Sequence, residues 1–181
     1  PFKYWIERVL KLQPWEEPEM VVEIPPNFTG KIIHDVLRSV YDWALEKNVK
    51  PGDANSIDQI FEVAREFLKS ESEACKRECP APPVIWKLTV SKLEGRLKNF
   101  LRSEFEKPDG FIYESGELDI LKNLNFGDES EVSLQIKGRI DRLDRSADGR
   151  SIRIVDYKTG RAPAKPEELR GGRRLQLPLY L

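Results

Sequence analysis

Hydrophobic residues recur at helical spacing over most of the first 105 residues. Four stretches carry such a stripe, and each predicts an amphipathic helix. The stretches are residues 2–12, a segment from about residue 29 to before Pro51, a segment that follows an N-cap at Ser56, and residues 86–105. Prolines between residues 14 and 26 predict an extended linker after the first helix. Charged residues 69–78 and the prolines of 80–83 predict a break between the last two helices.

The hydrophobic period changes from about 3.6 residues to about 2 after residue 110. Residues 111–121, 132–144 and 151–158 alternate between apolar and polar side chains, which predicts three strands. The Asp148-Gly149 pair between the last two strands predicts a hairpin. Residues 166–181 predict a final helix, which Pro178 shortens or kinks. This order predicts an α/β chain, more closely an α+β layered domain with a helical N-terminal half.

Composition narrows the class of protein. The 181 residues are 39% hydrophobic and 34% charged, which predicts one folded globular domain rather than a disordered chain. No apolar run approaches the roughly 20 residues of a membrane span, and residues 1–10 carry no signal-peptide pattern. With only two cysteines, we expect a cytoplasmic protein without a disulfide scaffold. The chain begins without Met and ends inside an apolar helix, so we also expect it to be a piece of a larger protein.

The small net charge hides an asymmetry. The whole chain has a net charge of −1, but residues 136–181 contain 12 lysines and arginines against 6 acidic residues. The acidic excess lies in residues 1–135. A basic end could face a polyanion such as DNA, or its arginines could solvate one face of a sheet. Charge alone leaves both interpretations open.

The predicted hairpin carries the candidate chemistry. Asp156 and Lys158 are two residues apart on one strand, so their side chains leave the same face. If the hairpin turns at Asp148-Gly149, Asp141 lies roughly opposite Asp156. Two carboxylates at this spacing repel each other unless a cation lies between them, and Mg²⁺ prefers such oxygen ligands. The pattern therefore predicts a divalent-metal site at which Lys158 stabilises charge on a phosphate.

A structural interpretation of the same residues competes with this one. Acidic and basic side chains on neighbouring strands can form a cross-strand ladder on a solvated face. The partners would be Asp141, Asp144 and Asp156 with Arg139, Arg142 and Arg153. The apolar neighbours Ile154 and Val155 favour the metal site, because a carboxylate among apolar residues needs a cation.

Several linked motifs resemble one family. Gly138-Arg-Ile-Asp-Arg-Leu-Asp144, Ile154-Val-Asp-Tyr-Lys-Thr-Gly160 and Leu175-Gln-Leu-Pro-Leu-Tyr180 resemble, in this order, the RecB-like nucleases of the PD-(D/E)XK superfamily. Gly30-Lys-Ile-Ile-His-Asp-Val-Leu37 is similar to the helix of that family that carries a histidine, and Pro1-Phe-Lys-Tyr-Trp5 to its Cys-Pro-Phe segment. The nuclease domains of AddB-type and RecB-type helicase–nuclease subunits are the best match. The resemblance implies a restriction-endonuclease-like core, a central mixed sheet flanked by helices.

The resemblance also implies roles for individual residues. It assigns the metal, Mg²⁺ with Mn²⁺ as an alternative, to His34, Asp141, Asp156 and the carbonyl of Tyr157. On the residues alone, a single histidine beside an apolar stripe is more often a partly buried structural residue. The catalytic set that the family implies is Asp141, Asp156, Lys158, Gln176 and Tyr180, with either Glu117 or Glu114 matching a further glutamate. The candidate DNA contacts are Arg139, Arg161, Arg173, Arg174, Gln176 and Tyr180.

The implied function is metal-dependent hydrolysis of DNA. We expect a deoxyribonuclease, more an exonuclease than an endonuclease, from a bacterial helicase–nuclease of double-strand-break repair and recombination. Its partners would be DNA and a helicase domain or subunit, since no phosphate-binding loop for ATP occurs here. The cysteines of the family's iron–sulfur cluster would lie outside this chain, because Cys75 and Cys79 alone cannot hold one. The family's fourth core strand would also follow residue 181.

Two alternatives remain open at this point. Nuclease-like domains can lose their activity and serve as DNA-end-binding or scaffold modules. Nucleases of CRISPR adaptation resemble the same motifs. The joint presence of His34, Asp141, Asp156 and Lys158 favours an active enzyme.

Overall fold

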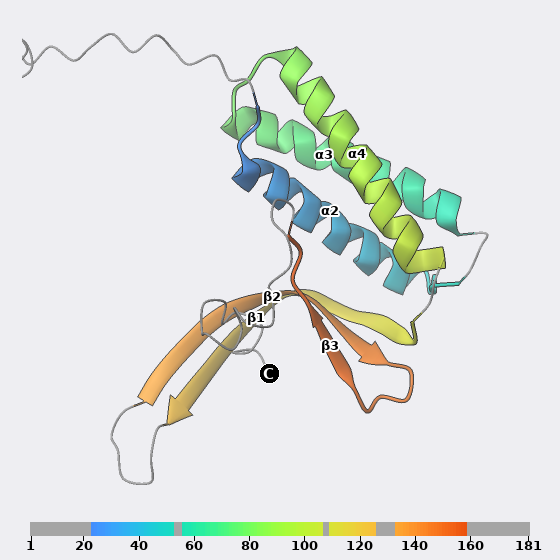
Figure 1. The fold of residues 1–181 in the computed structure, drawn as a ribbon, viewed down its shortest axis with the longest axis vertical. Helices are drawn as coiled ribbons and strands as arrows, with labels where there is room; N and C mark the ends of the chain where they lie inside the picture. The colour runs from blue at the N-terminus through green and yellow to red at the C-terminus, as the bar shows by residue number, and fades with distance from the viewer. Residues whose placement is uncertain (1–22, 53–55, 107–108, 126–132, 159–181) are drawn as a thin grey trace, which may run out of the picture.

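Three helices and a three-stranded sheet make up the computed structural model, which describes residues 23–52, 56–106, 109–125 and 133–158 (Figure 1). The helices are α2 (Pro26–Glu46), α3 (Ile57–Glu78) and α4 (Pro83–Glu106). The strands are β1 (Phe111–Asn125), β2 (Ser133–Ser146) and β3 (Ile152–Val155). The predicted helices at residues 2–12 and 166–181 lie outside the described residues. Within the described part of the chain, no helix is long and apolar enough to cross a membrane.

The helices follow the predicted apolar stripes. Pro26 opens α2, where proline is favourable because the first helical N–H has no partner. Ser56 occupies the N-cap position of α3 as predicted, although its side chain makes no capping hydrogen bond. Buried side chains on the three helices interlock into one core, which includes Ile32, Val36, Ile60, Leu68, Leu97 and Leu101.

The predicted break at residues 69–78 is wrong. These residues form the last turns of α3, and the break begins only at Cys79. Ser72 and Cys75 continue the buried stripe of the helix through this charged segment. Glutamate, lysine and alanine are good helix formers, and Lys76 also pairs with Glu73 one turn away. High charge therefore did not end the helix; the prolines after Cys79 did.

The sheet has the order β1-β2-β3 with antiparallel neighbours. The hairpin turns where the sequence predicts, at residues 147–150, with Gly149 at φ 71°. A hydrogen bond from the Ser146 N–H to the Ser151 carbonyl closes this loop. Both strand pairs in the described residues are antiparallel, so the mixed sheet that the resemblance implies is not seen within them.

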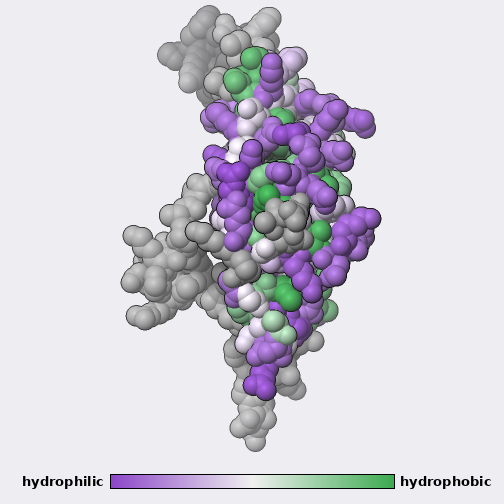
Figure 2. All heavy atoms as spheres, turned by 90° about the vertical axis from the view of Figure 1, so that its right-hand side faces the viewer, coloured by the Kyte–Doolittle hydropathy of each residue, from purple (hydrophilic) through white to green (hydrophobic). Residues whose placement is uncertain are grey.

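The arrangement of layers places α2 between the other two helices and the sheet (Figure 1). α2 packs on α3 and also contacts β1 and β2, so it connects the helical core to the hairpin. The far halves of β1 and β2 extend away from the helices as an arm (Figure 1). On the face shown in Figure 2, hydrophilic side chains cover most of the described surface, and apolar side chains form only small patches. The mixed α/β fold that the sequence predicts is confirmed.

Candidate active site

The site lies where β2 and β3 run closest to α2. Arg142 of β2 pairs with Val155 of β3. Continuing this register by one residue brings Asp141 opposite Asp156, as the sequence predicts. His34 reaches the same place from α2, which the packing of its buried neighbours Ile33 and Leu37 holds against the core.

The peptide group of Tyr157 links the two elements. Its N–H donates a hydrogen bond to Asp141 Oδ2 over 2.7 Å. Its carbonyl oxygen lies 3.1 Å from His34 Nε2 and can only accept, so Nε2 carries the proton in this contact. The Tyr157 ring also packs edge-on against His34 and Phe100, with centroid distances of 5.6 and 5.8 Å. One residue of the chain therefore fixes both the carboxylate and the imidazole.

The remaining atoms of this pair face each other. His34 Nδ1 lies 3.6 Å from Asp141 Oδ1. In a neutral ring protonated at Nε2, both atoms offer lone pairs, so the contact is favourable only with a proton or a metal ion between them.

Asp141 stands among other carboxylates. Burial raises the pKa of Asp141, hydrogen bonding to the Tyr157 N–H and the nearby His34 oppose this, and the charges of Asp156 and Glu117 raise it further. The net effect is a pKa above the ordinary value of an aspartate. A bound cation would remove this electrostatic cost.

Glu117 completes a cluster of potential ligands. One ligand atom each from His34, Glu117 and Asp141 lies within 4.8 Å of the others. The backbone of Glu117 has φ 51°, in the left-handed region that residues other than glycine rarely adopt. Such strain is often found where function fixes a residue. Glu114, the other candidate of the sequence, instead pairs with Arg145 over 2.7 Å outside this cluster.

Asp156 and Lys158 form a second part of the site. The Lys158 ammonium donates a hydrogen bond to Asp156 Oδ1 over 2.9 Å and lies 2.7 Å from Asp156 Oδ2 in the same ion pair. The Lys158 side chain remains 49% exposed, whereas that of Asp156 is 12% exposed. Asp156 lies outside the group of His34, Glu117 and Asp141, although its charge acts on Asp141. In this arrangement Lys158 can turn from Asp156 to an incoming anion.

The cross-strand ladder of acidic and basic side chains is found in a different part of β2. Asp144 Oδ1 accepts from Arg142 over 2.6 Å, and Asp144 Oδ2 accepts from Arg153 over 2.6 Å. Arg142 also donates to Tyr41 and Glu104 from the helices. The ladder interpretation is therefore correct for Asp144, while His34, Tyr157 and Lys158 surround the other two aspartates. Tyr41 and Glu104 were not predictable as partners of Arg142, because each lies on a helix without any local motif.

Arg139 is the one candidate DNA contact that the structure describes. Its guanidinium bonds Asp119 over 2.7 Å and Glu117 over 3.3 Å. It therefore neutralises acidic groups on β1 next to the site. The other candidates lie outside the described residues: Arg161, Arg173, Arg174, Gln176 and Tyr180.

The two cysteines belong to the helical core. Cys75 and Cys79 are free thiols, both buried at the end of α3. Burial raises the pKa of the Cys75 thiol, an effect that the nearby Lys31 opposes. The Cys79 carbonyl accepts a hydrogen bond from the Trp86 indole. These contacts are structural.

Several known proteins are similar to this chain over most or all of its length. The family model of the PD-(D/E)XK nuclease superfamily matches residues 1–181. A protein named as the B subunit of an ATP-dependent helicase/deoxyribonuclease, from Thermoanaerobacter sp. (strain X514), is 30% identical over 191 residues, covering 100% of this chain. Proteins of the same name from Clostridium acetobutylicum and Bacillus cereus (strain G9842) are each 26% identical, over 100% and 84% of the chain. The chain spans only 16%, 16% and 14% of the lengths of these three relatives.

Proposed function

Because this chain belongs to the PD-(D/E)XK nuclease superfamily, we propose that it is a metal-dependent deoxyribonuclease domain that hydrolyses DNA phosphodiester bonds. The relatives named as helicase/deoxyribonuclease subunits support a place in a helicase–nuclease that acts on DNA ends as an exonuclease during repair and recombination. The helicase would then belong to another part of that assembly. The observation that carries the proposal is the Tyr157 peptide group, which holds Asp141 and His34 together beside Lys158.

The residues present fit a divalent metal ion. A neutral His34 protonated at Nε2 would present the lone pair of Nδ1 toward Asp141 Oδ1, and Glu117 adds a carboxylate within the same cluster. The Nε2–H of His34 donates to a backbone carbonyl, as is usual for histidines that bind metals. The Tyr157 carbonyl keeps a second lone pair for a metal. Mg²⁺ and Mn²⁺ both accept such a set of carboxylate and carbonyl oxygens.

Each residue contributes a separate part of the chemistry. When bound, the metal would polarise the scissile phosphate and lower the pKa of a water molecule. Asp141, Glu117 and His34 would hold it, with Asp156 next to them. Lys158 would donate to the phosphate oxygens as negative charge develops there. The water would lose one proton as its oxygen adds to phosphorus, the phosphodiester P–O bond would break, and the leaving oxygen would take up a proton.

Metal binding and DNA cleavage test the proposal separately. Isothermal titration of Mn²⁺ and Mg²⁺ into the full chain should give saturable binding that Asp156→Ala weakens. Labelled DNA should be cut only with metal, and Lys158→Ala should abolish the cutting. Lys137→Ala is the matched control, because Lys137 is an exposed lysine of β2 outside the site.

Two outcomes would contradict the proposal. Full cleavage by Lys158→Ala would show that the site does not perform the chemistry. Metal-independent DNA binding without cleavage by the wild-type chain would instead support an end-binding or scaffold module.

A further inference from the structure

A groove lies beside the candidate active site. It has a volume of about 340 Å³ and runs between α2, α4 and the residues that leave β3. Asp156 and Lys158 line it on the side of the site. Apolar side chains from the two helices line the rest, including Leu37, Leu97 and Phe100. The groove is therefore continuous with the site that would hold the scissile phosphate.

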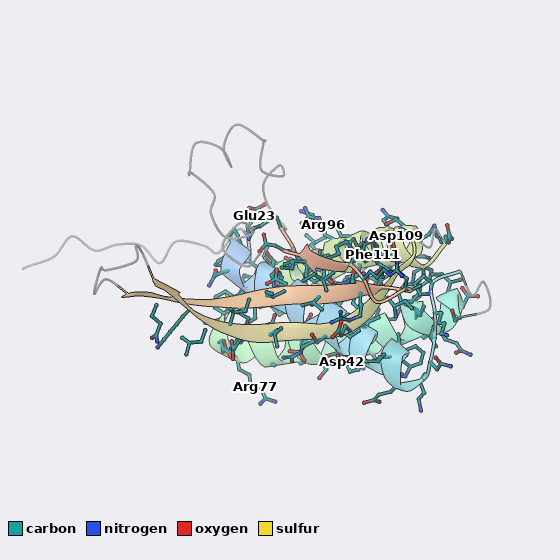
Figure 3. All side chains as sticks on the ribbon, turned by 90° about the horizontal axis from the view of Figure 1, so that it is seen from below. Glu23, Asp42, Arg77, Arg96, Asp109 and Phe111 are labelled. Carbon is teal, nitrogen blue, oxygen red and sulfur yellow. The ribbon has the colours of Figure 1, made fainter. Side chains whose placement is uncertain are left out.

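Arg96 of α4 lines the same groove. Its side chain is exposed and makes no ion pair with any residue that the structure describes. Neighbouring arginines differ, since Arg65 pairs with Glu94 and Arg102 pairs with Glu106. Figure 3 shows Arg96 near the point at which the chain leaves β3, while Arg77 lies at the opposite side of the molecule in that view. An unpaired guanidinium next to a phosphate-handling site is a ready anion contact.

The size and lining of the groove fit one nucleotide. Binding sites for small molecules begin at about 300 Å³, so the groove is too small for a helix or a strand pair. Phe100 is partly exposed and packs edge-on against Tyr157, which keeps its ring in place. An aromatic ring in an apolar groove offers a surface on which a base can stack, and the two cations at the rim complement phosphates.

We propose that this groove binds the nucleotide that adjoins the scissile phosphate of the DNA. Arg96 contacts the phosphate of that nucleotide, and its base lies against the partly exposed ring of Phe100. The inference rests on the proposed nuclease function and extends its site from the hairpin onto α4. Because stacking and phosphate contacts do not read base edges, the groove adds affinity without sequence preference.

The first test compares two exposed arginines. Binding of a fluorescent oligonucleotide to the full chain is measured without metal at several salt concentrations, for the wild type, Arg96→Gln and Arg77→Gln. Loss of one charged phosphate contact should weaken binding about tenfold in Arg96→Gln. The slope of log affinity against log salt should also fall by about 0.7–0.9. Arg77→Gln should match the wild type. Equal behaviour of the two variants would overturn the proposal.

The second test addresses the apolar side of the groove. Phe100→Leu keeps an apolar side chain but removes the aromatic surface, so affinity should fall about fivefold with no change in the salt slope. The competing occupant is a segment of protein. If Arg96→Gln and Phe100→Leu lower the melting temperature without changing DNA affinity, protein fills the groove and the proposal is wrong.

The two proposals can fail independently. Cleavage by Lys158→Ala tests the nuclease function, whereas the binding measurements need no metal and no catalysis. If Arg96→Gln lowers DNA affinity but the wild-type chain never cuts DNA, the groove proposal stands and the nuclease function is rejected. If cleavage needs Lys158 but Arg96→Gln and Arg77→Gln bind DNA equally well, the nuclease function stands and the groove proposal is rejected.

Discussion

Two aspartates three residues apart on β2 lie in opposite electrostatic surroundings. Asp144 is fully buried, and each of its carboxylate oxygens accepts from an arginine, Arg142 on one side and Arg153 on the other. Asp141 has no arginine partner among the contacts of the described residues. It faces a histidine and accepts from a backbone N–H, with further carboxylates nearby. β2 therefore carries a saturated cluster, in which arginines compensate the charge of Asp144. Next to it lies an unsaturated cluster around Asp141, in which no described arginine compensates the carboxylate.

The difference separates a carboxylate that arginines compensate from one that they do not. Around Asp144, positive charges compensate the carboxylate, and Arg142 extends the cluster to Glu104 and Tyr41 on the helices. A buried carboxylate without this compensation would be costly. Around Asp141, burial and neighbouring carboxylates raise the pKa, so the folded chain disfavours the charged form of this aspartate. A bound cation would remove this cost.

The largest expected effect is on cleavage by Asp141→Asn. Loss of this carboxylate should reduce metal-dependent cleavage by about 10³-fold or more, which is about 4 kcal/mol in activation free energy. The free energy of unfolding should not fall, because the variant removes an uncompensated charge. Both quantities are measured, by single-turnover cleavage and by urea denaturation. An inactive variant that is also strongly destabilised would contradict the division between the two clusters.

The opposite result is expected at Asp144. Asp144→Asn leaves Arg142 and Arg153 without their shared counter-charge, and breaking a buried ion pair costs about 3 kcal/mol or more. The midpoint of urea denaturation should therefore fall sharply. Cleavage by the molecules that remain folded at low temperature should stay close to that of the wild type. A loss of stability below about 1 kcal/mol would show that the cluster contributes little.

Metal should stabilise the protein through the unsaturated cluster only. At a concentration one hundred times its dissociation constant, Mn²⁺ should raise the free energy of unfolding by about 2.7 kcal/mol. Addition of EDTA should reverse the gain. Asp141→Asn should show no such gain, while Asp119→Asn, which changes an exposed carboxylate of β1, should keep it. Stabilisation that survives in Asp141→Asn would place the metal elsewhere.

The strained backbone of Glu117 predicts a smaller effect. Glu117→Gly and Glu117→Ala both remove the carboxylate, so both should lose cleavage. Only glycine adopts the left-handed conformation at φ 51° without strain. Relief of strain outweighs the greater entropy of unfolded glycine, so Glu117→Gly should be more stable by about 0.5–1 kcal/mol. If Glu117→Ala is at least as stable in urea denaturation, the strain is absent.

The sequence predicted the parts that local rules determine. Helical stripes, strand alternation and the Asp148-Gly149 turn placed all three described helices and all three strands. Their register then follows from the turn, so Asp141 opposite Asp156 was predictable. The position of His34 beside Asp141 was not, because a histidine on an apolar stripe has no local pattern; the family resemblance alone pointed to it. Its approach to Asp141 depends on the packing of α2 against the sheet.

The contacts between segments that are distant in the chain could not be predicted from the sequence. Arg142 meets Glu104 across 38 positions and Tyr41 across 101, and neither partner lies in a motif. The choice between Glu117 and Glu114 also depended on the irregular register of β1 near Tyr113 and Ser115, which periodicity does not reveal. A shift of one residue exchanges the faces of a strand, so only the paired structure could decide which glutamate faces the site.

The smallest prediction concerns Asp109 at the outer rim of the saturated cluster, beside Phe111 in Figure 3. Burial raises the pKa of Asp109, but a hydrogen bond from Arg153, the Phe111 N–H and the charge of Arg153 outweigh it, so the pKa is lowered. A lowered pKa means that the folded state favours the charged carboxylate, and the resulting stability is present above the unfolded pKa and lost as pH falls through the folded one. Since the side chain is 53% exposed, solvent screens the pair, and Asp109→Asn should cost less than about 1 kcal/mol at pH 7. Urea denaturation of both proteins between pH 7 and pH 3 should show this difference closing on the acidic side. A difference that widened in acid would mean that Asp109 is held by its packing and not by its charge.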